Sequence, residues 1–335
     1  MTLKIDPVDR AIIRLLMEDG RMPVAEMARR IADVSERVAH YRIDRLLQQG
    51  VIHVSAIVDP RAVGFTVRAD AFINVESGCI SAVAERLVEF EEVSFVACSF
   101  GEYDVSITVH ARDNTELYTF LAEVVANVPG VRATTVILVP VFLKDVYHWY
   151  IPDLQAPRSD DVPARKTFFL PSQVPICKID RLDQAIVHLL MEDGRMSAAE
   201  IARRIGGVSA RSVRDRVDSL IRCGVICVGA IVNPEAVGFP VRADVFIEVE
   251  SQHVLDVAQR LTELEETSYV ACSIGGADLS IQLCTRDNKE LYRFVTEVLH
   301  RVPGVTKTVT TLVPLVLKDV YDWRIPDSAC VDGNK

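Results

Sequence analysis

The chain has 335 residues, of which 49% are hydrophobic and 25% charged, with a formal net charge of -10 at pH 7. This composition is globular, and the length exceeds the roughly 100 to 200 residues of one domain, so two or more domains are expected. No apolar run approaches a membrane helix, the start MTLKIDPVDR lacks a signal region, and the eight cysteines include no CxxC pair; we expect a soluble cytoplasmic protein with no disulfide framework, cofactor or metal site.

The acidic excess is unevenly distributed. Residues 1–50 carry nine Lys/Arg against eight Asp/Glu, and residues 175–224 carry nine against seven. Because phosphate binding depends on the local surface, the negative total does not exclude a nucleic-acid partner for these two segments.

The chain contains one long unit twice. A shift of 174 residues aligns Ile5–Asp153 with Ile179–Asp327 without a gap. About six positions in ten are identical, and a period this long excludes a solenoid. The joint, residues 154–176, has four prolines and scattered charge, which predicts an extended linker.

Each unit begins with a helical segment. In the first copy Asp6 is placed to cap a helix, with Pro7 at its first position and Ile12, Ile13 and Leu16 on its apolar face. DGRM then makes a turn before a short second helix and a third helix. Three short helices joined by tight turns are typical of a helix-turn-helix domain.

The third helix is the element on which the functional prediction depends. In the second copy Ser209 is a good N-cap, and Val213, Val217, Leu220 and Ile221 lie on one face of a 3.6-residue period. The arginines are expected on the opposite face, where they could contact guanine or phosphate in a major groove. The candidate DNA-binding residues are Ser35, Arg37, His40, Tyr41, Arg42 and Arg45 in the first copy and Ser209, Arg211, Arg214 and Arg216 in the second.

The rest of each unit alternates between strands and helices. After a β-branched run over residues 50–65, the first copy predicts strands at 67–76, 93–100, 103–110 and 131–139, and helices at 80–90 and 113–127. This β-α-β-β-α-β order gives an antiparallel sheet with both helices on one face. Phe72, Val96 and Val109 are hard to leave exposed, so a partner sheet should cover the other face.

The turn between the second and third of these strands is a candidate effector site. Its glycines expose backbone amides that suit a carboxylate, and the Asp that follows suits an ammonium group. An ordinary hairpin turn is the alternative. The candidate residues are Ser99, Gly101, Glu102, Tyr103 and Asp104 in the first copy and Gly275, Gly276 and Asp278 in the second, where Ala277 replaces Tyr103.

Taken together, these motifs resemble the Lrp/AsnC (feast/famine) family of transcriptional regulators. The resemblance rests on ID..D..I...LMEDGR, the helix S...V..R...L...GVI, the strand GVI...AIV.P...G, and VPGV before the last strand. It implies a DNA-binding, winged-helix-like helix-turn-helix domain and a ferredoxin-like RAM domain that dimerises through its sheet and senses small molecules, often amino acids. The tandem duplication and the tail VFLKDVYHWYIPD depart from that pattern.

The fold class predicted is therefore α+β, with both domains present twice. The predicted domains are a first helix-turn-helix domain (1–52), a first ferredoxin-like domain (53–153), the linker (154–176), a second helix-turn-helix domain (177–226), a second ferredoxin-like domain (227–327) and a tail (328–335). The two units are expected to form a pseudo-dimer within one chain. The partners expected are double-stranded DNA, a small effector and further copies of the chain, but no membrane.

Two other functions stay open. The same fold resembles siroheme decarboxylases, which are expected to use histidines, yet none of the seven histidines stands opposite a histidine in the other copy. A regulator that has lost its effector and acts as an architectural DNA binder is the second alternative. For the Trp and Tyr residues of the LKDVY tails, two roles are possible: covering the sheet or an oligomer contact, or packing within the unit.

Overall fold

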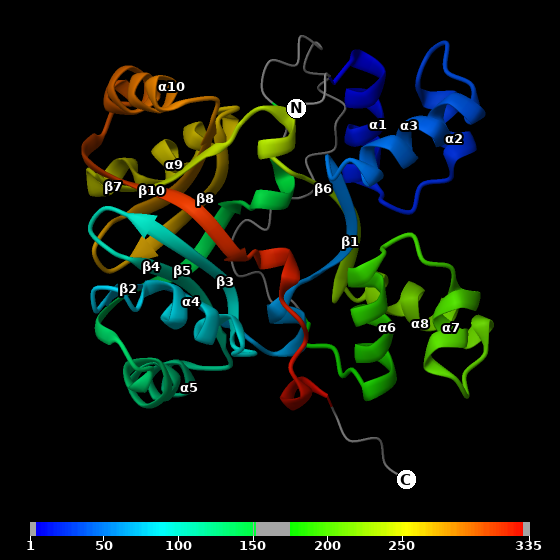
Figure 1. Ribbon diagram of the computed structural model, residues 1–335, viewed down its shortest axis with the longest axis horizontal. Coiled ribbons are helices and arrows are strands. Elements are labelled where there is room, and N and C mark those ends of the chain that lie inside the picture. Colours follow the sequence, from blue (N-terminus) through cyan, green and yellow to red (C-terminus); the bar gives the residue numbers. More distant parts are fainter. Residues whose placement is uncertain (1–4, 150, 152–174, 331–335) are drawn as a thin grey trace.

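The computed structural model describes residues 5–149, 151 and 175–330. In Figure 1 two helical domains lie side by side, and a barrel of strands flanked by further helices lies next to them. Most of the predicted linker, residues 154–174, lies outside the described residues, as does the end of the tail. Among the described residues, no helix is both long and apolar enough to cross a membrane.

The predicted three-helix segment is present in both units. A capping box begins the first helix of each, formed by Asp6 with Asp9 and by Asp180 with Asp183. Apolar side chains at helical spacing bury one face of each helix. The helices are α1 (Pro7–Glu18), α2 (Val24–Arg30) and α3 (Glu36–Gln48), and α6 (Arg181–Glu192), α7 (Ala198–Ile205) and α8 (Ala210–Arg222).

One detail of the predicted apolar face is wrong. Ile221, expected to face inward, is 42% exposed, whereas Val213, Val217 and Leu220 are buried. Ile221 lies 100° from Leu220 on the helix, so the narrow contact with α6 and α7 covers only one of the two.

The strand after each third helix pairs with its counterpart. Strands β1 (Ile52–Val58) and β6 (Ile226–Val232) form an antiparallel ribbon in which Ser55 stands opposite Gly229. Within the described residues neither strand forms a hairpin wing inside its own unit. The ribbon joins the two units, and the predicted boundary between residues 52 and 53 falls inside β1.

The ferredoxin-like order is confirmed in both units. The first contains β2 (Val67–Val75), α4 (Ile80–Val88), β3 (Val93–Phe100), β4 (Val105–Ala111), α5 (Asn114–Thr119) and β5 (Val131–Lys144). The second contains β7 (Val241–Val249), α9 (Val254–Glu263), β8 (Thr267–Ile274), β9 (Leu279–Thr285), α10 (Asn288–Arg293) and β10 (Val305–Lys318). Beyond α5, the predicted helix 113–127 continues as a π-turn and a 3-10 turn.

The two sheets close on each other as expected, through the ends of their longest strands. β5 pairs with β8 of the second unit, and β10 pairs with β3 of the first, which gives one closed eight-stranded barrel. Inside it the Phe72 and Phe246 rings meet edge to face at 4.9 Å. The chain is therefore its own pseudo-dimer.

The tail of each unit crosses to the other unit. The Trp149 indole N–H donates to the carbonyl of Glu265 at 3.0 Å, and the Trp323 indole donates to the carbonyl of Glu91 at 2.8 Å. Both indoles are 2% exposed. Packing within the unit, one of the predicted roles, is therefore wrong for the two tryptophans, which contact the other unit of the same chain.

Candidate functional site

The third helix of each helical domain presents a polar face to solvent. Arg37, His40 and Tyr41 are exposed on α3, and Arg211 and Arg214 on α8. The predicted caps are also exposed: the Ser35 hydroxyl accepts from the amide of Val38, and the Ser209 hydroxyl accepts from that of Ser212. These residues remain available to a nucleic acid.

Three arginines do not point outward as predicted. Arg42 pairs with the carboxylates of Asp6 and Asp9, and Arg45 reaches Asp9 at 2.6 Å. Asp9 is completely buried, so these arginines satisfy a carboxylate that would otherwise be unpaired.

Arg216 does the same in the second unit. Its guanidinium lies 2.7 Å from Asp183 and 2.8 Å from Asp180. These ion pairs hold α3 on α1 and α8 on α6. They could not be predicted from the sequence, because the i+3/i+4 spacing within one helix does not reveal an ion-pair partner on another helix.

The two helical domains are tied together by a reciprocal contact. The Arg21 guanidinium donates to the carbonyl of Gly194 at 2.7 Å, and that of Arg195 donates to the carbonyl of Gly20 at 2.6 Å. Both glycines pack on the β1–β6 ribbon, where a Cβ on either would lie 2.8 Å from a valine methyl. The repeated MEDGRM motif thus fixes how α3 and α8 are placed relative to each other.

The predicted effector turns lie at the contact between the units. A Cβ at Gly101 would lie 3.0 Å from Thr311 Oγ1, and one at Gly275 would lie 3.2 Å from the carbonyl of Val136. Glu102 and Gly276 are exposed at the tips.

The two Asp side chains of these turns already have backbone donors. Asp104 accepts from the amide of Val75 and Asp278 from that of Val249, each at 2.8 Å. Ser99 is buried and donates to the carbonyl of Tyr103 at 3.0 Å. The ordinary role of a hairpin turn therefore accounts for these three side chains.

A cavity of about 50 Å³ lies inside the barrel, between the two sheets. Its walls contain equivalent residues of both units, including the Asp70 and Asp244 pair and the Phe72 and Phe246 pair. Sequence reasoning did not single out these residues. The sequence does contain a pattern that could have identified them. Arg68, Asp70 and Phe72 alternate along one strand, which puts two charged groups on the strand face that the second sheet must cover.

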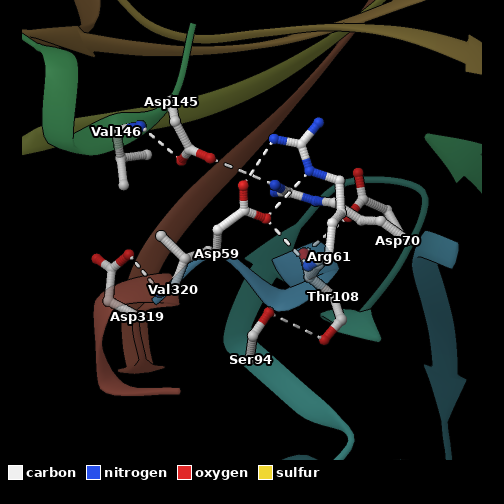
Figure 2. A network of polar contacts seen from close by, with 10 residues as sticks. Asp59, Arg61, Asp70, Ser94, Thr108, Asp145, Val146, Asp319 and Val320 are labelled. Atoms are coloured by element: carbon white, nitrogen blue, oxygen red, sulfur yellow. Dashed lines mark hydrogen bonds and ion pairs between the residues drawn. The ribbon is translucent and has the colours of Figure 1, made fainter. Parts of the chain in front are cut away.

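The cavity holds buried charge (Figure 2). Thr108 donates to Asp70 at 2.7 Å, and Arg68 pairs with Asp145 at 3.3 Å. Gln282 donates to Asp244 at 3.1 Å. Burial raises the pKa of Asp244 to about 7, the Gln282 hydrogen bond opposes this, and the nearby Asp70 adds to it. Burial also raises the pKa of Asp70.

Comparison with known families identifies both domain types twice. The AsnC-type helix-turn-helix domain matches residues 5–47 and 179–221. The Lrp/AsnC ligand binding domain matches residues 70–145 and 242–321. The two ligand-binding-domain matches contain most of the barrel strands and most residues of the cavity.

Single-unit relatives align with part of this chain. The HTH-type transcriptional regulator FL11 of Pyrococcus abyssi is 36% identical over 140 residues, which are 42% of this chain and 91% of the relative. The regulatory protein AsnC of Haemophilus influenzae is 29% identical over 136 residues, 40% of this chain and 90% of the relative.

One solved structure shares the fold over nearly the whole chain. The siroheme decarboxylase NirDL superposes with a TM-score of 0.65 at 15% identity, covering 96% of each chain. At this identity the likeness concerns the fold alone. The two family domains, present twice in order, and the 36% identity to FL11 over 91% of its length establish the assignment: the chain belongs to the Lrp/AsnC family, as a tandem duplicate.

Proposed function

We propose that the chain is a DNA-binding transcriptional regulator in which α3 and α8 bind two adjacent half-sites as a fixed but unequal pair. The observation that carries this is the reciprocal Arg21 and Arg195 contact, together with the shared ribbon, because it couples two exposed third helices into one unit. Paired helix-turn-helix domains bind half-sites whose spacing reflects the geometry of the pair.

The exposed side chains of the two helices favour different half-sites. α8 presents Arg211, Arg214 and Arg222 to solvent, whereas Arg37 is the exposed arginine of α3, beside His40 and Tyr41. Arginine reads guanine and phosphate, and aromatic or imidazole groups make different base contacts. The second helix should therefore provide more of the affinity and more of the salt dependence.

Selection of duplexes from a random library on the purified chain tests this proposal. We expect a site with two unlike halves, and a perfectly palindromic consensus would contradict it. Replacing Arg211 and Arg214 with Ala should weaken binding at least tenfold and flatten its salt dependence. The matched control is Arg260→Ala, an exposed arginine on α9 outside the helical domains.

A small effector, such as an amino acid, is proposed to act through the ligand-binding domains. The exposed Glu102 and Gly276 at the turns, together with Tyr103, remain candidates for contacting it. A panel of amino acids added singly to a fluorescence-anisotropy titration with the selected DNA tests this. A shift in affinity that Glu102→Gln and Tyr103→Ala abolish supports an effector at the turns, and no shift with any amino acid favours an architectural DNA binder.

Self-assembly is part of the proposal. Phe100, Ile274 and Leu315 are apolar and 54% to 69% exposed on the barrel. Such side chains favour further contacts between chains. Light scattering should give a mass above that of one chain, and a monomer at micromolar concentration would contradict this.

A siroheme-decarboxylase-like enzyme is the second candidate, favoured by the whole-chain likeness to NirDL. His110, which is buried against Trp323, has its pKa held well below the usual value by burial and by Arg68, and it has Cys284 as counterpart. Anaerobic incubation with siroheme followed by mass spectrometry tests the enzyme. Loss of carboxyl groups would establish it, and unchanged siroheme would remove it.

A further inference from the structure

The cavity inside the barrel has more acid than base. Arg68, which lines the cavity, pairs with Asp145 at 3.3 Å, and Arg242, which lies outside the lining, pairs with Asp319 at 3.1 Å. Asp70 and Asp244 remain, one from each sheet, each with a neutral hydrogen-bond donor as its partner, Thr108 or Gln282. Two buried carboxylates without a cation of their own are costly, because transfer from water disfavours the charged form.

The same cavity contains polar atoms without a partner. Within the described part of the chain, the Tyr269 hydroxyl, the Ser106 hydroxyl and the Arg68 Nε have no hydrogen bond. Tyr269 is 8% exposed and Ser106 is 5% exposed, and both line the cavity. Buried polar groups in folded proteins are nearly always satisfied by protein, water or ligand, so these atoms can bond to a polar molecule in the cavity, ordered water included.

Three aromatic rings form part of the remaining walls. Phe72, Phe95 and Phe246 line the cavity beside the two carboxylates. Aromatic faces attract cations, most strongly where water is excluded. A cavity of about 50 Å³ holds roughly three to five small atoms, since one water needs about 10 to 15 Å³.

From these observations we infer that the cavity between the sheets binds one small primary ammonium ion of a few heavy atoms, whose N–H groups donate to Asp70 and Asp244. A hydroxyl on the ligand would pair with Tyr269 or Ser106. The site is separate from the turns at 99–104 and 273–278. It also differs in stoichiometry, because both units build a single cavity.

The cavity lies between the two units, and both units contribute residues to its lining. Val146 and Val320 line the cavity, and each lies three residues before the tail tryptophan that crosses to the other unit. A ligand in the cavity thus touches both sheets and both tails. The inference about binding is independent of the proposed DNA function, because the experiment below contains no DNA.

Calorimetry on the full chain with ethanolamine, methylammonium and ethylammonium tests the inference. At least one should bind at one site per chain, and ethanolamine should bind more tightly than ethylammonium because of its hydroxyl. Asp70→Asn and Asp244→Asn should each weaken binding tenfold or more, and Tyr269→Phe should reduce the preference for ethanolamine. Asp256→Asn, an exposed carboxylate on α9, is the matched control and should bind as the parent does.

Proton release provides a second readout that does not depend on the variants folding. A bound ammonium favours the ionised forms of Asp70 and Asp244, so binding below pH 7 should release protons and produce heats that depend on the buffer. No heat and no thermal shift with any of the three amines would overturn the inference. Equal binding by the Asp244→Asn variant, or displacement of the amine by equimolar potassium, would overturn it as well.

Discussion

The indole ring of Trp149 packs edge to face on Phe239 with centroids 5.5 Å apart, so the tail of the first unit lies against the second unit. Trp323 makes the equivalent contact with Phe65 at 5.6 Å. Two exchanged tails thus connect the barrel to the helical domains, where both tryptophans belong to the same apolar core.

Replacing Trp149 with Ala should destabilise the chain by about 3 to 5 kcal/mol, the usual cost of removing a buried Trp. The reason is the lost packing on Phe239 together with the lost hydrogen bond from the indole to the carbonyl of Glu265. Urea unfolding followed by circular dichroism measures the change. Tyr118→Ala, at a side chain 73% exposed, should stay within about 0.5 kcal/mol of the parent.

Arg216→Ala should lower the free energy of unfolding of the second helical domain by roughly 2 to 3 kcal/mol. Arg42→Ala should have a smaller effect on the first helical domain. Removing Arg42 leaves Arg45 paired with the buried Asp9. In the second unit Ser219 stands at the position equivalent to Arg45, so among the described residues Arg216 is the one cation within 4 Å of Asp183. Thermal unfolding of the two variants measures this difference. Equal losses would show that the Arg45 contact has no stabilising value.

Arg21→Ala combined with Arg195→Ala should loosen the relative placement of the two helical domains, which the β1–β6 ribbon still joins, without unfolding either. Binding to a duplex with both half-sites should fall about tenfold. Once one helix is bound, the other is no longer held in position over its own half-site, so the effective concentration for the second binding step is lower. Binding to a single half-site should not change, since α3 and α8 keep their exposed faces. Anisotropy titrations with the two duplexes measure this, and a parallel loss on both would contradict the role of the Arg21 and Arg195 contact.

Asp244→Asn should stabilise the chain at high pH. The folded carboxyl has a pKa of about 7, against about 3.9 in the unfolded chain, so between these values the folded state binds more protons and stability falls as pH rises. Asparagine removes this loss while still accepting from Gln282, so the variant should be more stable by about 2 to 4 kcal/mol at pH 8 and similar at pH 4. Urea unfolding at both values measures it, and a destabilised variant at pH 8 would contradict the buried acid.

Local patterns in the sequence determined a large part of this protein. The capping Asp6 and Asp180, the apolar faces of the helices and the β-α-β-β-α-β order follow from spacing and turn chemistry, which act within a few residues. The need for a covering sheet also followed from Phe72, whereas Val96 and Val109, predicted on the same face, pack in the core with α4 and α5. The duplication then indicated that the cover would come from the same chain.

Tertiary structure alone decided which charged groups serve the fold and which remain free. Arg42 and Arg37 look alike in the sequence, but Arg42 meets Asp6 and Asp9 on another helix and Arg37 meets solvent. Likewise, Asp70 and Asp244 are 174 residues apart and become one buried acidic pair only when the barrel closes. The physical reason is that burial and pairing depend on through-space distance, which periodicity along one element does not encode.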